Sequence, residues 1–280
     1  MLDIDNLICC PFCKGDLRPN TQNGQQWLRK RELSSFYCNK CNHKFPLVNS
    51  IVDFSPVRPK KRTLAQQLME SKSIVEKYEG KSGRGSWLFA GYLGISFKEE
   101  MALVKKIAHI NNDDTVLDLA CGTGLYTRDL AKEGGNRKVI GVDISWPMLK
   151  YAVKMIKAQK IENIALFHGD AHHLPLRDFS VDAAICCGAL HIFCDVHQAL
   201  EELSRVIKPN GHLALAVFFA ESNLFGKFKR YWRKEMWGIH SFQETELKEL
   251  LNKASFAPAI SHAWGKWMIA GGTRKKGVTH

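Results

Sequence analysis

Short apolar runs alternate with amphipathic segments from Met101 onwards, and this alternation predicts the architecture of most of the chain. The apolar runs have the length and composition of strands that are buried on both faces of a sheet. The expected strands are 115–119, 138–143, 164–168, 181–187 and 212–219. A helical period is clearest between the second and third runs, where four apolar side chains share one helix face: Leu149, Ala152, Val153 and Ile156.

The βαβα order of these segments predicts an α/β fold with a Rossmann-like, doubly wound and mostly parallel sheet. Near the end of the chain, the runs 259–262 and 267–273 flank a Gly-Lys turn, which predicts a C-terminal antiparallel hairpin strand. Ahead of the sheet, residues 63–81 have a polar helical pattern. Residues 87–95 are aromatic and glycine-rich, as is typical of a loop or lid.

A proline-rich and basic stretch at 55–62 interrupts the chain and predicts a domain boundary. We therefore expect three parts: a cysteine-rich head over residues 1–57, a linker and helix over 58–85, and a larger body over 86–280. Within the body, an insertion near 221–242 is expected to form a cap over the sheet.

The composition, with 45% hydrophobic and 24% charged residues among 280, is that of an ordinary globular protein. The N-terminus lacks the basic start of an export signal, and no apolar run reaches the roughly 18 residues that span a bilayer. These features predict a cytoplasmic protein without a transmembrane segment, and they leave peripheral contact with lipid open. The net charge of +12 suits nucleic acid, anionic lipid or an acidic partner, but it bears on association rather than on chemistry. The sequence does not determine an oligomeric state.

Two C-x-x-C pairs mark the head: Cys10 with Cys13, and Cys38 with Cys41. Four thiolates in this paired spacing are typical of a closed, tetrahedral zinc site. A head of this size has a small core, so Zn²⁺ would contribute to its folding, and a site with four protein ligands has no open position for catalysis. Cys9 is the alternative first ligand, but Cys10 keeps the spacing and precedes a proline.

A glycine turn follows the first expected strand of the body. Gly122 and Gly124 lie in this turn and allow the backbone to approach a ligand closely. A dinucleotide fingerprint would place a third small residue where Thr127 stands, so NAD is disfavoured. Carboxylates at the carboxyl ends of three strands complete the expected pocket, because such sheets bind ligands at that edge: Asp118, Asp143 and Asp170.

Ordered motifs carry a resemblance to a known family. Residues 116–124 (VLDLACGTG), 141–145 (GVDIS) and 169–171 (GDA) resemble the motif series of class I methyltransferases, which use S-adenosylmethionine. Residues 205–211 (RVIKPNG) also match, with Asn210 where the family usually has glycine. The resemblance implies that the chain is a methyltransferase and that its cofactor is S-adenosyl-L-methionine.

The resemblance also assigns roles within the site. The methionine part of the cofactor would lie against the glycine turn, with Asp118 holding its amino end directly or through water. Asp143 would accept both ribose hydroxyls, and Asp170 with Ala171 would meet the adenine. The complete expected set of cofactor-binding residues is Asp118, Ala120, Gly122, Gly124, Asp143, Ile144, Met148, Asp170, Ala171 and Cys187.

The head resembles the zinc ribbon of tRNA-methyltransferase activator subunits, because its two cysteine pairs are followed by residues 45–54 (FPLVNSIVDF). The whole chain is similar to such a zinc ribbon fused to a type 11 methyltransferase. Residues 188–191 (GALH) and 241–247 (SFQETEL) are also similar to cyanobacterial and plastid fusion methyltransferases.

Methyl transfer from a sulfonium is an in-line displacement on an activated carbon, so orientation and exclusion of water can provide much of the rate. A general base is needed only where the acceptor loses a proton near the transition state. His191, just after the fourth strand, is the candidate base, and local packing or hydrogen bonding is its alternative role. His172 and His173 are expected to line or cap the adenine pocket. Cys186 and Cys187 lack the proline-cysteine motif of pyrimidine carbon-5 methylation and are expected to be buried thiols.

Aromatic residues recur at helical spacing in the insertion, with basic residues on a second stripe, so this segment is expected to cover the acceptor. An ordinary core helix with a solvated face is the alternative. The expected substrate cap consists of Trp87, Tyr92, Phe225, Phe228 and Trp232.

Three functions remain open for the chain. The first is methylation of a small acceptor molecule, a lipophilic or aromatic metabolite of the quinone or polyketide kind. The second is methylation of a base in rRNA or tRNA, favoured by the net charge, the basic linker and the zinc-bearing head; the cap would exclude a flipped base unless it opened. The third is a non-catalytic interaction module in which the head recruits a partner.

Overall fold

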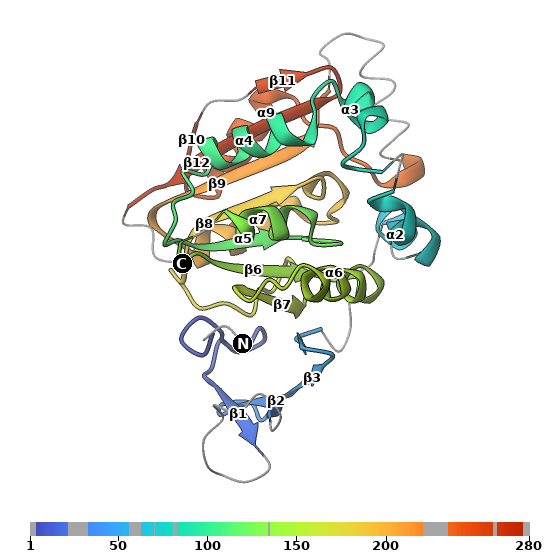
Figure 1. Ribbon diagram of the computed structural model, residues 1–280. Coiled ribbons are helices and arrows are strands. Elements are labelled where there is room, and N and C mark those ends of the chain that lie inside the picture. Colours follow the sequence, from blue (N-terminus) through green and yellow to red (C-terminus); the bar gives the residue numbers. More distant parts are fainter. Residues whose placement is uncertain are drawn as a thin grey trace.

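A computed structural model describes residues 4–21, 33–55, 63–69, 71–80, 83–133, 135–220, 235–259 and 262–276 (Figure 1). The strands of the head are β1 (Leu17–Thr21), β2 (Leu33–Cys38), β3 (Lys44–Val48) and β4 (Ile51–Asp53). The strands of the body are β5 (Thr115–Leu119), β6 (Lys138–Asp143), β7 (Ile164–His168), β8 (Val181–Cys187), β9 (Ile207–Phe218), β10 (Phe256–Pro258), β11 (His262–Trp264) and β12 (Trp267–Arg274). The helices are α1 (Leu64–Met69), α2 (Lys72–Tyr78), α3 (Trp87–Leu93), α4 (Phe97–Ile107), α5 (Leu125–Lys132), α6 (Trp146–Ala158), the short 3-10 helix η1 (Leu190–Ile192), α7 (Val196–Val206) and α9 (Glu244–Lys253).

These strands form one mixed sheet in the order β1-β2-β3-β4-β7-β6-β5-β8-β9-β12-β10, and β11 pairs with β12. The ladder is parallel from β7 through β6, β5 and β8 to β9, and β12 joins β9 antiparallel. The predicted α/β fold with a doubly wound sheet and a C-terminal antiparallel hairpin is therefore confirmed. The last parallel strand begins at Ile207 rather than at residue 212, because Ile207 also pairs with Val181 of β8. The register between the two strands shifts between Val181 and Ala183.

Helices cover both faces of the body sheet, because side chains of a strand alternate between the faces. On one face, α4 and α5 pack Val104 and Leu130 against Val116 of β5. On the other face, α7 and α9 bury Leu200 and Leu251 in a separate core cluster. The sheet is thus a packed middle layer whose polar positions are concentrated at its carboxyl edge.

The head covers part of the sheet face on which α7 and α9 pack. The connection between β7 and β8, residues 169–180, contains no helix, and its Leu174 and Leu176 would lie open to water without a cover. Ile8 and Phe36 of the head pack into the same apolar cluster. The strand β4 also pairs in parallel with β7, so the head contributes the next strand of the body sheet at the lower edge seen in Figure 1.

Two expectations ahead of the sheet require correction. Residues 87–95 were expected to form a loop, but they form the helix α3, because the Ser86 hydroxyl accepts a hydrogen bond from the backbone N–H of Phe89 and Gly94 ends the helix at φ +88°. The pattern over 63–81 forms two short helices, α1 and α2, and Ser71 caps the second. In this region the helix bounds therefore follow the capping residues rather than the pattern of apolar positions.

Candidate active site

A left-handed backbone conformation shapes the loop between β5 and α5. Ala120, Gly122 and Gly124 have φ values of 57°, 53° and 74°, and the last of these is the N-cap of α5. Glycine adopts this conformation at no steric cost, whereas Ala120 does so at an expense in backbone strain. The loop bends tightly over the end of β5 and directs the first backbone N–H groups of α5 towards the carboxyl edge of the sheet.

Asp143, at the end of β6, ties this loop to the next one. Its Oδ2 accepts a hydrogen bond of 2.7 Å from the backbone N–H of Gly122, and its Oδ1 accepts one of 2.7 Å from Ser145. Each carboxylate oxygen can accept a further hydrogen bond, since an ionised carboxylate offers about four lone-pair sites. Asp143 therefore holds the loop in place and lines the cleft.

Asp118 lies deeper than the other carboxylates, with only 2% of its surface exposed. Its Oδ2 accepts a hydrogen bond of 2.5 Å from the hydroxyl of Thr127. Burial raises the pKa of Asp118 to about 7; the Thr127 hydrogen bond opposes the rise, and the negative charge of Asp143 adds to it. The residue that replaces the third glycine of a dinucleotide fingerprint is thus the partner of this buried acid.

Asp170 and His172 form a pair at the end of β7. The Oδ1 of Asp170 accepts hydrogen bonds from the backbone N–H of His172 at 3.0 Å and lies 2.6 Å from its ring Nδ1. Burial would raise the pKa of Asp170, but the His172 hydrogen bonds outweigh burial, and the pKa is lowered. Asp170 is therefore an ionised acceptor at the far end of the cleft from the glycine turn.

These loops enclose a cleft with about 750 Å³ of empty space, including space open to solvent, which is sufficient for a nucleoside-sized ligand. Every residue of the expected cofactor set lines it except Asp118, which is buried in β5 beneath the glycine turn, and Gly124, the N-cap of α5. Among the lining side chains that were not predicted, Gln66 and Met69 come from α1, Tyr78 comes from α2, and Phe193 directly follows η1. The helical pattern of residues 63–81 was visible in the sequence, but nothing local indicated that Gln66, Met69 and Tyr78 would approach the sheet.

A second cavity, of about 1220 Å³ including open space, adjoins the first and shares Met69, Tyr78, Gly188 and Ile192 with it. Its wall is mostly apolar and aromatic. The remaining lining residues include Leu68, Ile74, Phe89, Phe218, Trp237, Ile239 and Trp267, together with the polar side chains of Lys77, Arg84 and His191. We call this second space the acceptor cavity.

His191 lies in the wall of the acceptor cavity and is buried. Its ring is 4.5 Å from the ring of Phe218 and 6.0 Å from that of Trp267, measured between centroids. Its backbone carbonyl accepts a hydrogen bond from the N–H of His240, which connects η1 to the segment before α9. The candidate base is thus held beside the cofactor cleft by aromatic packing.

The expected substrate cap is only partly described. Phe225, Phe228 and Trp232 lie outside the described residues. Trp87 is 79% exposed, and neither it nor Tyr92 lines the cavity; Tyr92 instead contacts the Lys266 ammonium. On α3 the aromatic side chain that faces the cavity is Phe89, because the helical turn carries Trp87 to the opposite side.

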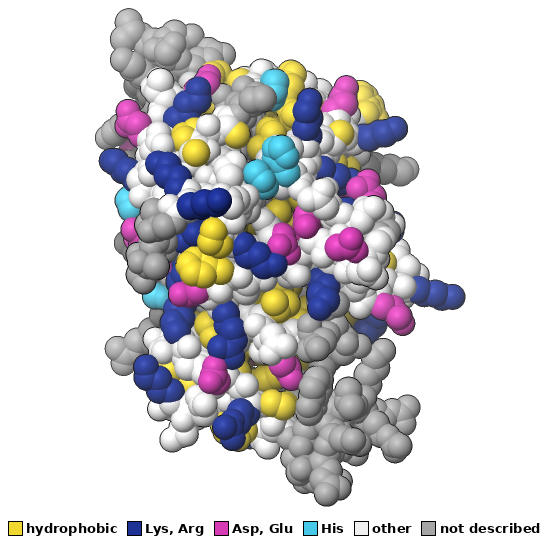
Figure 2. All heavy atoms as spheres, turned by 90° about the vertical axis from the view of Figure 1, so that its left-hand side faces the viewer, with side chains coloured by type: hydrophobic (Ala, Val, Ile, Leu, Met, Phe, Trp, Pro, Cys, Tyr) yellow, Lys and Arg dark blue, Asp and Glu magenta, His cyan; other side chains and the backbone are white. Residues whose placement is uncertain are grey.

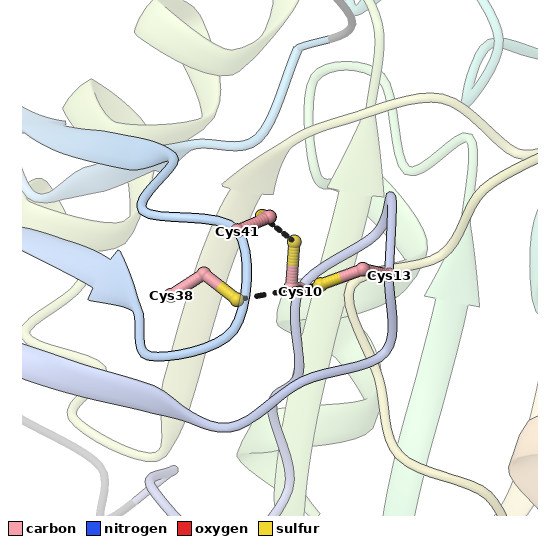
Figure 3. Close-up of side chains that lie close together, drawn as sticks. All are labelled: Cys10, Cys13, Cys38 and Cys41. Atoms are coloured by element: carbon pink, nitrogen blue, oxygen red, sulfur yellow. Dashed lines mark hydrogen bonds between the residues drawn. The ribbon is translucent and has the colours of Figure 1, made fainter.

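The four cysteines of the head converge from two loops (Figure 3). Their Sγ atoms lie within 4.8 Å of one another, with 3.6 Å between Cys10 and Cys41 and 3.4 Å between Cys13 and Cys38. Zinc–sulfur bonds of about 2.3 Å in a tetrahedron place the sulfurs about 3.8 Å apart, so the donor set fits the ion. Cys9 points elsewhere, and its Sγ donates to the carbonyl of Leu176.

A chain of contacts leads from the head to the cofactor cleft. Asp53 of β4 places its Oδ1 2.8 Å from Nδ1 of His168, at the end of β7. The other ring nitrogen of His168 lies 2.9 Å from the carbonyl oxygen of Ile144, the residue that follows Asp143. The head therefore contacts the loop that lines the cleft through a single imidazole.

Comparison with known proteins agrees with this geometry. The chain matches the family described as "Methyltransferase domain" over residues 116–211 and the "Trm112p-like protein" family over residues 4–50. It is 31% identical over 227 residues to a demethylmenaquinone methyltransferase of Listeria welshimeri, an alignment that covers 72% of this chain and 95% of the relative. A chloroplastic methyltransferase of Arabidopsis thaliana is 26% identical over 255 residues, covering 86% of this chain and 67% of the relative.

Solved structures show the same fold. A chain from the complex between the Haloferax volcanii Trm112 methyltransferase activator and a methyltransferase superposes with a TM-score of 0.59 at 21% identity, covering 75% of this chain and 98% of that one. None of the helices in the described part of this chain is long and apolar enough to cross a bilayer.

Proposed function

The chain belongs to the S-adenosylmethionine-dependent methyltransferases, and we propose that it methylates a small lipophilic or aromatic acceptor of the quinone or polyketide kind. The observation that carries this proposal is the acceptor cavity, whose wall is mostly apolar and shares four residues with the cofactor cleft. Apolar cavities with few polar groups are typical binding sites of small molecules. The Listeria relative, a demethylmenaquinone methyltransferase, supports a quinone-like acceptor.

The carboxylates and the glycine turn of the first cleft fit S-adenosylmethionine. Asp143 would accept hydrogen bonds from the two ribose hydroxyls, and Asp170 would accept one from the adenine amino group beside Ala171. The glycine turn lies against the methionine part. Asp118, beneath the turn, would act on the methionine ammonium through its charge or through a water molecule, because it does not itself line the cleft.

When bound, the cofactor supplies a methyl group on a positively charged sulfur. The acceptor nucleophile forms the new bond to this carbon while the carbon–sulfur bond breaks and its electron pair stays on sulfur. We propose that the aromatic wall of the acceptor cavity orients the acceptor and excludes water. His191 would take the proton that the acceptor loses, since its imidazole lines the acceptor cavity next to Ile192, a residue that both cavities share.

The first experiment tests the acceptor class. The full chain is incubated with methyl-labelled S-adenosylmethionine and, in separate reactions, a prenylated naphthoquinol or total RNA. We expect label in the organic extract of the quinol reaction. Label confined to RNA would assign the chain to the base methyltransferases instead. On the face shown in Figure 2, which lies on the side of the molecule away from α2 and α6, Lys and Arg side chains are interspersed with Asp and Glu.

His191→Gln tests the proposed base. We expect the variant to lower kcat by about 100- to 10,000-fold, with its affinity for S-adenosylmethionine unchanged. His197→Gln is the matched control, because His197 is an exposed residue of α7 that pairs with Glu201. An unchanged kcat in His191→Gln would show that His191 is not the general base, but it would leave the assignment as a methyltransferase intact. The absence of both cofactor binding and turnover in the wild type would favour the interaction module.

The head carries a further part of the proposal. We propose that Cys10, Cys13, Cys38 and Cys41 hold a structural zinc ion as thiolates. A hydrogen bond from the backbone of Gly15 is the largest influence on Cys13 and lowers its pKa to about 7. Burial raises the pKa of Cys10 to about 12. A bound cation would stabilise both thiolates. Through β4 and the Asp53–His168 contact, the head would support the cofactor loop within a single chain. The complex with a separate Trm112 activator supports this role.

A further inference from the structure

A buried arginine lies in the wall of the acceptor cavity, between α2 and α3. Arg84 is only 4% exposed, and its backbone N–H donates to the carbonyl of Tyr78, a residue shared by both cavities. A buried charged side chain in a mostly apolar wall is costly unless its hydrogen bonds are made. Arg84 therefore needs partners on both sides of its guanidinium group.

One side of the guanidinium is fully supported by the protein. Nη2 donates to Glu100 and, at 2.6 Å, to the hydroxyl of Tyr126. Glu100 also accepts from the Tyr126 hydroxyl at 2.8 Å and from Trp267 Nε1 at 3.1 Å. Three aromatic rings lie 5.2–5.7 Å from the Cζ of Arg84: Phe89, Tyr126 and Trp267. The plane of the guanidinium group is thus held before any ligand arrives.

The other side is not supported. Among the described residues, Nη1 of Arg84 is fully buried and has no hydrogen-bond partner. Such an atom is uncommon in native proteins, and it calls for a missing partner. Other buried arginines of the chain differ, since Arg137 donates from Nε, Nη1 and Nη2 to Asn111, Leu130 and Asn112.

The pattern at Arg84 is that of a preorganised binding group. Glu100 balances its charge, and burial, which would lower the pKa of Arg84, is outweighed by Tyr126 and Glu100, so the guanidinium remains charged. Arg84 lines the acceptor cavity, so an acceptor atom of a bound molecule can supply the missing partner where it displaces the side chains that cover Nη1. Charged N–H donors bind oxygen anions more strongly than neutral oxygens.

Building on the proposed function, we propose that the methyl acceptor carries an oxygen anion, a phenolate or a carboxylate, that binds Nη1 of Arg84. The apolar wall would bind the ring system, and Arg84 would select acceptors that present the anion at this position. An ionised phenol is also a better nucleophile than the neutral one, so the contact would favour the reactive form of the acceptor. Arg84 is then a specificity-determining residue as well as a structural one.

Binding of three probes to the full chain saturated with S-adenosylhomocysteine tests the proposal. The probes share one ring system: 2-naphthoate, 2-naphthol and the uncharged 2-methoxynaphthalene. We expect the wild type to bind the carboxylate or the naphthol at least about tenfold more tightly than the ether in calorimetry. Which of the two binds more tightly identifies the anion, and bound naphthol would show naphtholate absorption.

Variants separate recognition from structure. In Arg84→Met the preference should fall to about onefold while the affinity for 2-methoxynaphthalene stays the same. Arg84→Lys keeps a charge, but its single ammonium cannot bind Glu100 and a ligand in the way that the two Nη groups can. This variant should also lose most of the preference, and it replaces Arg84→Met in the test if the methionine variant does not fold. Arg137→Met is the matched control: it removes a buried arginine outside both cavities and should lower the melting temperature without changing the preference.

Three outcomes would overturn the proposal: no preference in the wild type, a preference that survives in Arg84→Met, or an equal loss of affinity for all three probes. The last would show that Arg84 is only structural. If none of the probes binds while S-adenosylhomocysteine does, the apolar acceptor class itself is wrong. That failure is distinct, because label transfer from S-adenosylmethionine tests the acceptor class without reference to Arg84.

Discussion

Single residues set the binding properties of the cleft, and Asp143 has two tasks there. It accepts backbone hydrogen bonds from Gly122 and Ser145, and it is expected to accept the ribose hydroxyls. Asp143→Asn replaces one acceptor oxygen with a donor amide, so a backbone N–H loses its partner and a ribose contact is lost. We expect the affinity for S-adenosylmethionine to fall about 100-fold, or about 2.7 kcal/mol, in calorimetry.

Asp129→Asn is the control for this substitution, because Asp129 pairs with Lys105 on the outer side of α5 and lines neither cavity. Its affinity for the cofactor should equal that of the wild type. A change within about threefold in Asp143→Asn would mean that the cofactor binds without this carboxylate.

Asp118 gives the protein a pH dependence whose sign follows from its burial. Its pKa is about 7 in the folded chain against 3.8 for an unperturbed aspartate. Between these values the folded state holds a proton that the unfolded state has released, so stability falls as the pH rises towards 7 and then levels off. The melting temperature of the wild type without ligand should decrease over this range, relative to Asp118→Asn.

The variant is the internal reference, since an amide cannot ionise but can still accept the hydrogen bond from Thr127. Saturation with S-adenosylmethionine should flatten the wild-type slope, because the cationic groups of the cofactor favour the ionised acid. Parallel slopes in wild type and variant would assign the pH dependence to other groups.

At the scale of elements, the hairpin of β3 and β4 connects the head to the body sheet. Its two turn residues, Asn49 and Ser50, have φ values of 53° and 69°, as a two-residue turn of type I′ requires. Serine adopts this conformation at an energetic cost that glycine avoids. Ser50→Gly should therefore stabilise the chain by about 0.5–1 kcal/mol, seen as a rise of about 1–3 °C in melting temperature.

Ser34→Gly is the matched control for the turn, because Ser34 lies within β2 and its hydroxyl donates to the carbonyl of Asn20. Glycine in a strand lowers stability, so the control should shift the melting temperature in the opposite direction. A fall in both variants would show that the turn does not have the strained conformation.

For the whole molecule, the shared sheet and shared core make the head a part of one folding unit. Elemental analysis should find about one zinc ion per chain in the wild type and none in Cys38→Ser. Loss of the ion should lower the free energy of unfolding by several kcal/mol, as expected for a structural zinc site. Since the head covers Leu174 and Leu176, the body should unfold with it in a single transition.

Cys9→Ser provides the corresponding control, as the Cys9 thiol donates to Leu176 and lies outside the cluster. It should retain the zinc ion. Loss of zinc in Cys9→Ser, or its retention in Cys38→Ser, would contradict the assigned ligands. Two separate melting transitions in Cys38→Ser would contradict the single folding unit.

The sequence by itself determined those features in which the relevant residues are neighbours along the chain. The strand bounds from β5 to β8, the glycine turn, the carboxylates near the ends of three strands and the paired cysteines were all predicted, because a period, a turn or a spacing is encoded locally. Where capping groups competed with composition, as at α3, the prediction failed. Ser86 and Gly94 define a helix in a stretch whose glycines suggested a loop.

Only the tertiary structure decided which distant residues meet. Nothing in the sequence places Arg84 beside Glu100, or Asp53 beside His168, because these contacts arise from packing across separate layers. Packing also determined that Phe89 rather than Trp87 faces the acceptor cavity. The cofactor motifs are local and therefore readable, whereas the acceptor cavity is assembled from helices, strands and loops that are remote in sequence.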